Sequence, residues 1–379
     1  MRLATFNVEN LFRRVNALNQ DTWEKSRPVL TDYKRFNEFI AKPKYTPAIK
    51  DEIADLLLKY GLQTRRSSVD AFFILNEVRG KLFVMPKGGK KPRIDVNGRG
   101  DWEGWLELKR TDLDSDEVEN TGRVVKTVAA DILAVVEAED RLSLRLFRDQ
   151  ILKRPEPVYG RIDYPYYRLV EGNDDRGIDV GLYSRHPIVD MNSNVDYGPF
   201  GKPVFSRDCA EYVIRTPKKN HILVMVNHLK SQGYGSKNDN DNLRKRQAAG
   251  IAAIYNARKA DFPLVAIVGD FNDAPESSAL KPLLDGNLGL RDVMSHARYK
   301  AKKDPTFKPK PKPLGTFGSG ATKFDYILLS PALWTKVRNV GVERRGIWAP
   351  RTFPHFPEVT GPQNAASDHA AVWVDLDVP

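Results

Sequence analysis

Residues 264–273 read LVAIVGDFND, a run of five apolar residues that leads into a short polar cluster. A continuous apolar run bounded by a turn signal is typical of a strand buried on both faces. Side chains alternate along a strand, so Asp270 and Asn272 are expected on the same side of its end. An Asx turn that only closes the strand is the alternative explanation. The stretch predicts a buried strand with a carboxylate and an amide at its C-terminal end.

Further polar clusters stand at the ends of apolar, β-like runs elsewhere in the chain. They are Thr5–Asn10, Asp131–Glu137, Asn227–Lys230, Lys323–Tyr326 and Ser367–His369. Strands can bring such ends together into one site of carboxylates, amides and imidazoles. Such a site is suited to hold a hard divalent cation and to cleave a phosphate ester.

Composition narrows the class of protein. Among the 379 residues there is no run of about 18 apolar residues that would span a membrane. The single cysteine, Cys209, excludes an internal disulfide and a multi-cysteine zinc site. Met1 leads almost directly into the apolar segment Leu3–Val8, which leaves no room for a signal peptide, so we expect a cytoplasmic protein. The formal net charge of +11 favours a polyanionic partner, nucleic acid first, with solubility as the other explanation.

The periodicity after residue 120 alternates between strands and helices, as in an α/β protein. Helices are expected at 121–130, 141–152 and 242–259, and strands at 3–8, 132–136, 180–183, 210–215, 222–226, 264–268, 326–329 and 371–376, with a loop at 231–242. Because the first and last polar clusters belong to one site, we expect a single domain over 1–379 with an insertion at about 12–120.

Within that insertion, Ile49–Leu58 has helical periodicity and stops at Gly61. Lys81–Met85 and Trp102–Leu108 are expected to pair as a β-hairpin with a basic tip. Nearer the C-terminus, Lys300–Pro313 contains six lysines and four prolines and is predicted to be an extended, exposed loop.

In their order along the chain the clusters resemble the endonuclease/exonuclease/phosphatase superfamily, and in motif the bacterial extracellular-nuclease-like members. This superfamily includes DNase I-like and abasic-site nucleases, sphingomyelinases and inositol phosphatases. The resemblance runs from about Asn7 to His369. It implies a DNase I-like α/β (α+β) fold, a four-layer α/β/β/α sandwich of two mainly antiparallel sheets flanked by helices. The site is expected at one edge of the sandwich.

The resemblance also implies roles for individual residues. In the family, the residue at the position of Asp270 orients or deprotonates the attacking water. The residue at the position of Asn272 donates a hydrogen bond to the phosphate. Asn7 matches the residue that lies beside the metal and the phosphate. His228 matches a histidine that contacts the scissile phosphate and can protonate the leaving oxygen. Lys230 and Arg244 are then candidates for binding the substrate, although Arg244 also fits a solvated start of a helix.

The acidic metal ligand requires a choice, because two segments resemble the family's strand that ends in this residue. The family places the Glu six residues after an Asp, which Asp131 and Glu137 satisfy. Asp70 and Glu77 are seven residues apart, and a one-residue slip turns the side chain to the other face of a strand. By resemblance, Glu137 is therefore the expected acidic metal ligand. Val136 stands where many members carry Gln.

The last two clusters supply the remaining site residues. By resemblance His369 is the imidazole at the phosphate, and either Asp325 or Asp368 holds its orientation by a hydrogen bond. Asp368 can instead bind the metal, and the sequence leaves these alternatives open. Asp179 points into the site if its strand has already begun, or else belongs to a turn.

These residue types favour Mg²⁺ or Mn²⁺, which prefer oxygen ligands, over zinc, because His228 and His369 lack short ligand spacing. No residue resembles a covalent nucleophile, so we expect direct attack of water. The leading hypothesis is a metal-dependent DNA endonuclease. The alternatives are a phosphatase or phosphodiesterase for a small-molecule or lipid ester, and a catalytically silent nucleic-acid-binding module. The intact set of principal catalytic residues argues against the silent module.

Overall fold

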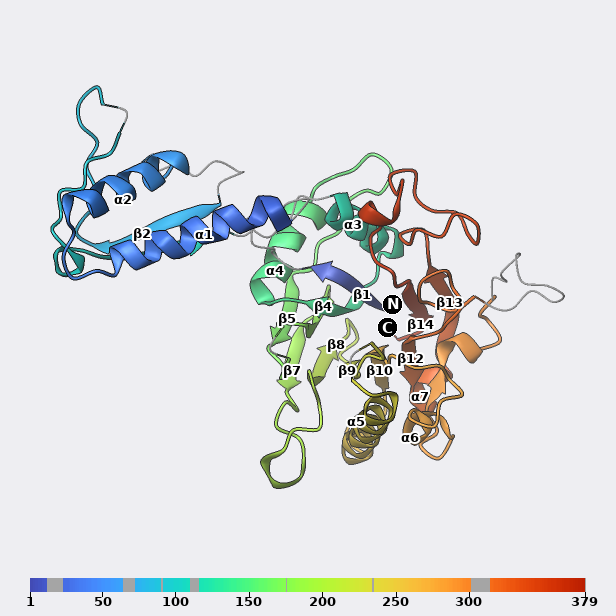
Figure 1. The fold of residues 1–379 in the computed structure, drawn as a ribbon. Coiled ribbons are helices and arrows are strands. Elements are labelled where there is room, and N and C mark those ends of the chain that lie inside the picture. Colours follow the sequence, from blue (N-terminus) through green and yellow to red (C-terminus); the bar gives the residue numbers. More distant parts are fainter. Residues whose placement is uncertain are drawn as a thin grey trace. The chain divides into compact units, whose positions relative to one another are not determined.

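The computed structural model describes residues 1–11, 23–63, 72–89, 91–109, 116–174, 176–233, 235–300 and 314–378 (Figure 1). The chain forms two compact units. Unit 1 consists of Met1–Phe12 and Leu113–Pro379, and unit 2 of Arg13–Asp112.

Unit 1 is built on two six-stranded sheets. The first has the order β13-β14-β1-β4-β6-β5, with bounds Val337–Glu343, Ala371–Leu376, Arg2–Leu11, Ile132–Ala138, Asp179–Ser184 and Tyr166–Val170. The second has the order β11-β12-β10-β9-β8-β7, with bounds Arg291–Asp292, Asp325–Leu329, Val265–Asp270, His221–His228, Cys209–Arg215 and Ile188–Asn192. Among the described strands of these two sheets, only β1 with β4 and β9 with β10 run parallel. Two mainly antiparallel sheets flanked by helices confirm the predicted fold class.

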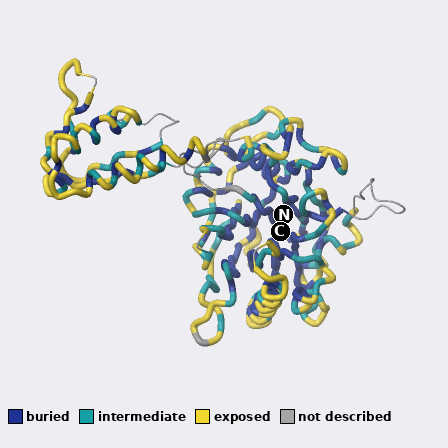
Figure 2. Tube along the Cα trace, viewed as in Figure 1, coloured by how far each residue is buried: buried dark blue, intermediate teal, exposed yellow. Residues whose placement is uncertain are grey.

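The main core of unit 1 lies between the two sheets. β4 contributes Ile132, Ala134 and Val136 to it, and β9 contributes Val224 and Val226, all fully buried. The opposite face of β4 packs into a second core under the helices, which explains its uninterrupted apolar sequence. Figure 2 shows these strands as the buried centre of the unit.

Helices cover the outer faces of the sheets. α3 (Asp116–Val128), α4 (Arg141–Leu146) and the π-helical turn η2 (Phe147–Leu152) contribute to the core on the first sheet, and α5 (Lys237–Arg258) to the core on the second. Smaller helices are α6 (Lys281–Leu284) and α7 (Pro331–Trp334), and 3₁₀ turns are η1 (Arg99–Asp101), η3 (Pro199–Gly201), η4 (Val293–Ser295) and η5 (Pro362–Asn364). Among the helices of the described ranges, none combines the length and apolar composition needed to cross a bilayer.

The helix expected from Asn242 begins earlier, at Lys237. Ser236 is its N-cap, and the Ser236 hydroxyl accepts a hydrogen bond from the backbone N–H of Asp239. The predicted loop at 231–242 is therefore wrong in its second half, because this cap outweighs the low helix propensity of the Asn and Asp residues that follow it. The short edge strands β5, β7, β11 and β13 were not predicted.

Unit 2 has its own core. The amphipathic helices α1 (Trp23–Ile40) and α2 (Pro47–Lys59) pack with a two-stranded sheet of β2 (Phe73–Arg79) and β3 (Glu103–Leu108). The core includes the fully buried Leu57 and Trp102, and the Trp102 indole donates a hydrogen bond of 2.9 Å to the Tyr45 hydroxyl. The insertion expected at about 12–120 covers this unit. The single-domain assignment stays a prediction, since compactness does not establish independent folding.

The hairpin predicted in this unit is wrong in one strand. β3 pairs with β2 rather than with Lys81–Met85, which makes only the isolated bridge of Val84 with Arg93. The Glu77 carboxylate on β2 accepts the Leu82 N–H across the turn at Gly80, whose φ is 71°. The predicted basic loop at 300–313 lies outside the described residues except for its first residue.

Separate cores predict that unit 2 can be destabilised alone. Replacing the fully buried Leu57 by Ala should lower the stability of unit 2 by about 2–5 kcal/mol, because it leaves a cavity. Hydrogen exchange resolved by peptide should then show faster exchange in 23–109 and unchanged protection in β4, β9 and β10. Leu58→Ala is the matched control, since the Leu58 side chain is 40% exposed. Equal loss of protection in the strands of unit 1 would contradict this prediction.

Candidate active site

Strand register aligns the polar residues at one end of the two sheets. Asp270 pairs with His228 in the parallel ladder of β10 and β9, and with Asp325 in the antiparallel ladder of β10 and β12. In the other sheet, Asn7 pairs with Val136, one residue before Glu137. These side chains therefore meet where β1, β4, β9, β10 and β12 meet.

The segment 269–272 is held in an unusual backbone conformation. Gly269 has a φ of 131°, and a Cβ there would lie 1.9 Å from the Asn227 carbonyl oxygen, so only glycine fits. Asn272 has a φ of 53°, and its backbone N–H donates to Asp270 Oδ1 over 2.7 Å. Its side-chain amide donates to Asp270 Oδ2 and to the Leu229 carbonyl, each over 3.2 Å. The Asx turn is present, and it also fixes the orientation of the Asp270 carboxylate.

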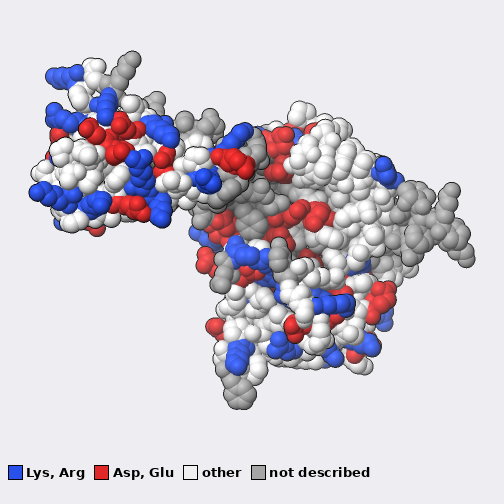
Figure 3. All heavy atoms as spheres, in the orientation of Figure 1, with Lys and Arg blue, Asp and Glu red and all other residues white. Residues whose placement is uncertain are grey.

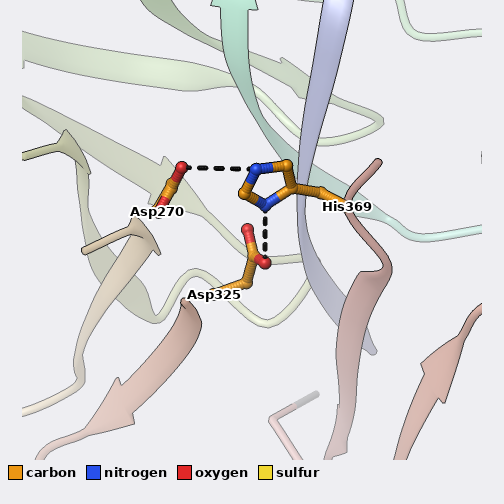
Figure 4. A group of neighbouring side chains, drawn as sticks. All are labelled: Asp270, Asp325 and His369. Carbon is orange, nitrogen blue, oxygen red and sulfur yellow. Dashed lines mark hydrogen bonds and ion pairs between the residues drawn. The ribbon is translucent and has the colours of Figure 1, made fainter. Parts of the chain in front are cut away.

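His369 lies between two buried carboxylates (Figure 4). Its Nδ1 is 2.9 Å from Asp325 Oδ2, and its Nε2 is 3.7 Å from Asp270 Oδ2. Burial lowers the pKa of the imidazole, but the attraction of Asp325 and Asp270 outweighs it and raises the pKa to about 10. At neutral pH the ring is therefore a cation, and Asp325 determines its orientation. Asp368 Oδ1 is 3.5 Å from Nε2, so Asp325 rather than Asp368 makes the orienting contact.

Asn7 connects the two sheets at the site. Its Nδ2 donates to Glu137 Oε1 over 3.2 Å and to Asp270 Oδ2 over 3.1 Å. Glu137 has a φ of 67°, and burial raises the pKa of its carboxyl. His228 Nε2 lies 3.7 Å from the same two carboxylate oxygens, and burial lowers the pKa of that imidazole well below its usual range. His228 is thus neutral where His369 is charged.

Asp270 is buried, and its carboxyl is a weaker acid than that of an ordinary aspartate. Burial raises its pKa to about 7, with repulsion from Asp325 and Glu137 adding to the shift and attraction by His369 opposing it. A carboxylate with a pKa near neutrality is suited to accept a proton from water.

Glu9 and Ser367 hold the loop that carries Asp368, and neither was among the predicted site residues. The Glu9 carboxylate accepts the Asp368 N–H over 2.7 Å, and the Glu9 N–H donates to Asn7 Oδ1 over 2.9 Å. The Ser367 hydroxyl donates to the Asn7 carbonyl over 2.8 Å. Both residues belong to clusters singled out in the sequence, but only the contacts reveal what they do.

Arg207 is another residue that was not among the predicted site residues, and it belongs to none of the clusters singled out in the sequence. Its side chain is 3% exposed and forms an ion pair of 3.0 Å with Asp174. Burial lowers its pKa, while attraction by Asp174, Glu137 and Asp270 opposes the shift. Its Nε is buried without a hydrogen-bond partner among the described residues. A lone Arg before a strand has no pattern that would have identified it.

Three predicted residues have surroundings that refine their roles. Arg244 is buried, and its nitrogens donate to Asp273, Asp241 and the Lys230 carbonyl, so it anchors α5 to the loops after β9 and β10. It is not retained as a substrate ligand, because its nitrogens are engaged inside the protein. Asp179 is buried and accepts the Gly172 N–H over 2.8 Å, and burial raises its pKa to about 6. The ammonium pKa of Lys230 is lowered, first by burial and then by Arg207 and Arg176.

The oxygen donors at this site fit a divalent cation. Burial, followed by repulsion from Glu9 and Glu137, raises the pKa of Asp368 to about 6, against the attraction of His369. Crowded carboxylates with raised pKa values are what a bound cation would relieve. Asp270, Asp325 and His369 also have ligand atoms within 4.8 Å of one another. Within that trio His369 and Asp325 already engage each other over 2.9 Å, so we favour Glu137, Asp368 and Asn7 as ligands.

The comparisons identify the family. The model of the Endonuclease/Exonuclease/phosphatase family matches residues 99–369, and the chain belongs to this family. Its members are generally divalent-metal-dependent hydrolases that act on phosphoester bonds. No curated protein matches the chain.

Three similar solved structures have low sequence identity to this chain. A mannosyl-6-phosphatase from Bacteroides thetaiotaomicron is 17% identical with a TM-score of 0.48, covering 69% of this chain and 91% of its own. Truncated TDP2 from Caenorhabditis elegans is 17% identical with a TM-score of 0.43, covering 68% and 89%. Beta toxin from Staphylococcus aureus is 17% identical with a TM-score of 0.44, covering 69% and 93%.

The charge of His369 can be measured directly in protein freed of metal by EDTA. Its imidazole should stay protonated well above pH 8, since its pKa is about 10, whereas His228 should stay neutral down through its usual titration range. Asp325→Asn should lower the His369 pKa by removing the largest attraction. Histidine-resolved NMR titration provides the measurement. A His369 that titrates near 6.5 in the wild-type protein would contradict the arrangement.

The metal assignment predicts a thermal shift that does not depend on activity. Mn²⁺ should raise the melting temperature of the wild-type protein, because an ion that binds only the native state stabilises it. Glu137→Gln should lose most of this rise, since it replaces a charged ligand by a neutral one. Asp190→Asn, at an exposed carboxylate on β7, should keep it. The same rise in Glu137→Gln as in the wild type would exclude Glu137 as a ligand.

Proposed function

We propose that this protein is a divalent-metal-dependent phosphodiester hydrolase and, specifically, a DNA endonuclease. The observation that carries the proposal is the meeting of Asp270, the Asp325–His369 pair and Asn7–Glu137 from two different sheets at one point. Hydrolysis of a phosphodiester needs an aligned water, neutralised phosphoryl oxygens and help for the leaving alkoxide. Each need has a residue of suitable chemistry here.

The cofactor would be Mg²⁺ or Mn²⁺, held by Glu137 with Asp368 and Asn7. When bound, it would supply positive charge at the phosphoryl oxygens. The oxygen-rich donor set and the raised pKa of Glu137 support this choice.

The side chains divide the remaining work. Asp270 orients a water and accepts its proton, and Asn272 holds the Asp270 carboxylate in position. The charged His369 and the buried Arg207 stabilise the negative charge that builds up on the phosphoryl oxygens. Neutral His228 is a further donor, and Lys230 adds positive charge nearby, while the Asn7 amide is engaged by Glu137 and Asp270. No covalent intermediate is required, because water attacks phosphorus directly and the alkoxide leaves with a proton that the charged His369 can supply.

The preference for DNA rests on charge. The net charge of +11 favours a polyanionic substrate. The same residues would hydrolyse a small phosphate ester, so a phosphatase or phosphodiesterase is the second candidate, to be separated from a nuclease by experiment.

The test is nicking of supercoiled plasmid with Mg²⁺, Mn²⁺ or EDTA. The wild-type protein should nick only with metal, and Asp270→Ala, His369→Ala and Glu137→Ala should each lose at least about a hundredfold in rate. Asp190→Ala, an exposed carboxylate outside the site, is the matched control and should keep its activity. No nicking combined with hydrolysis of small esters would move the function to the second candidate. Site variants that cleave both substrates at wild-type rates would refute the site.

A further inference from the structure

The positive charge of the chain is concentrated in unit 2. Residues 13–112 contain 21 Lys and Arg against 14 Asp and Glu, so about a quarter of the chain carries +7 of the net +11. Unit 1 carries the remaining +4, and its catalytic centre is rich in buried or half-buried carboxylates. A polyanion is therefore attracted to unit 2 more strongly, residue for residue, than to unit 1.

Part of this charge gathers where α1 leads into α2. We call this region the basic end and define it as Lys42, Lys44, Lys50 and Arg99. Arg99 N–H donates to the Lys42 carbonyl over 3.0 Å, and Lys50 Nζ lies 3.2 Å from Asn97 Oδ1. Tyr45 N–H donates to the Asn97 carbonyl over 2.7 Å, so the 97–99 segment lies directly against the α1–α2 turn. Figure 3 shows basic side chains at this end of the unit.

The turn that presents these charges is rigidly packed. A Cβ at Gly98 would lie 1.9 Å from the Pro43 carbonyl oxygen, so the two backbones are in close contact between Lys42 and Lys44. Thr46 caps α2 immediately afterwards, and the hydroxyl of the buried Tyr45 accepts a hydrogen bond from the Trp102 indole. Charges held in fixed positions lose less entropy on binding than charges on a loose chain.

The two lysines of the turn differ from four other cations of the unit in having no acidic partner among the described residues. Arg35, Lys59, Lys91 and Arg93 each form ion pairs with Asp or Glu at 2.6–2.7 Å. Lys42 and Lys44 are exposed and form no ion pair with any described residue. The nearby Asp101 carboxylate accepts the Asn97 N–H over 2.6 Å and so is engaged within the turn. Unpaired lysines on a fixed turn are suited to contact successive phosphates of a nucleic acid backbone.

From these observations we propose that unit 2 binds the phosphate backbone of nucleic acid through the basic end. The proposal rests on the proposed function, because such binding is useful only if the site of the same chain cleaves nucleic acid. A substrate held by unit 2 is then kept at high local concentration for that site. The recognised chemistry is the phosphodiester backbone, without a base preference, because lysines read no base in this way.

The test compares two double charge reversals. Lys42→Glu with Lys44→Glu alters the basic end. Lys218→Glu with Lys219→Glu makes the same change of charge at the exposed turn before β9, at the opposite end of that strand from His228. Any effect of total charge alone should be equal in both variants. Circular dichroism and the Mn²⁺-dependent rise in melting temperature verify that each variant is folded.

Binding of a fluorescently labelled DNA duplex is measured by anisotropy in EDTA, over a range of salt concentrations. The basic-end variant should bind about tenfold or more weakly, and its slope of log affinity against log salt should be shallower by about 2, one for each lost phosphate contact. The control variant should keep a slope close to that of the wild type. Equal affinities and slopes for the two variants would overturn the proposal.

Plasmid nicking then separates this inference from the proposed function. With Mg²⁺, the basic-end variant should show a raised KM, because binding rather than chemistry is impaired. A wild-type duplex that is bound through the basic end but never nicked would refute the nuclease assignment alone. Nicking by the basic-end variant with the wild-type KM would refute the inference alone.

Discussion

The amide of Asn7 is the contact on which the site depends. It donates to Glu137 at the end of one sheet and to Asp270 at the end of the other, and it is fully buried. Two carboxylates on opposing sheets would repel each other, and a shared donor offsets that repulsion. Asn7 is itself held by Glu9 and by Ser367, so both termini of the chain contribute to one junction.

Around this junction the protein distributes charge unevenly between similar groups. The two histidines are both buried, but His369 has the buried Asp325 at 2.9 Å and is charged, whereas His228 lies no closer than 3.7 Å to a carboxylate and is neutral. Burial also raises the pKa of Asp270 to about 7. Environments that give chemically similar groups different pKa values are typical of catalytic sites.

The two units divide the electrostatics of the chain. Unit 1 concentrates carboxylates where the sheets meet, which suits a metal and a reacting phosphate. Unit 2 carries most of the net positive charge on a small core of its own. In a protein that acts on a polyanion, this division would separate the holding of substrate from its cleavage.

The sequence by itself determined the strands of the core and the residues at their ends. The apolar runs of β4, β10 and β14 are local features of the sequence, so they could be predicted, and the resemblance supplied the sandwich fold in which they pack. Tertiary structure decided what local pattern does not encode. Arg244 is a structural anchor, and Arg207 and Glu9 belong to the site. β3 pairs with β2 rather than with residues 81–85. Each of these features depends on contacts between residues that are distant in the chain. The choice of Asp325 over Asp368 to orient His369 likewise depended on a distance between two strands.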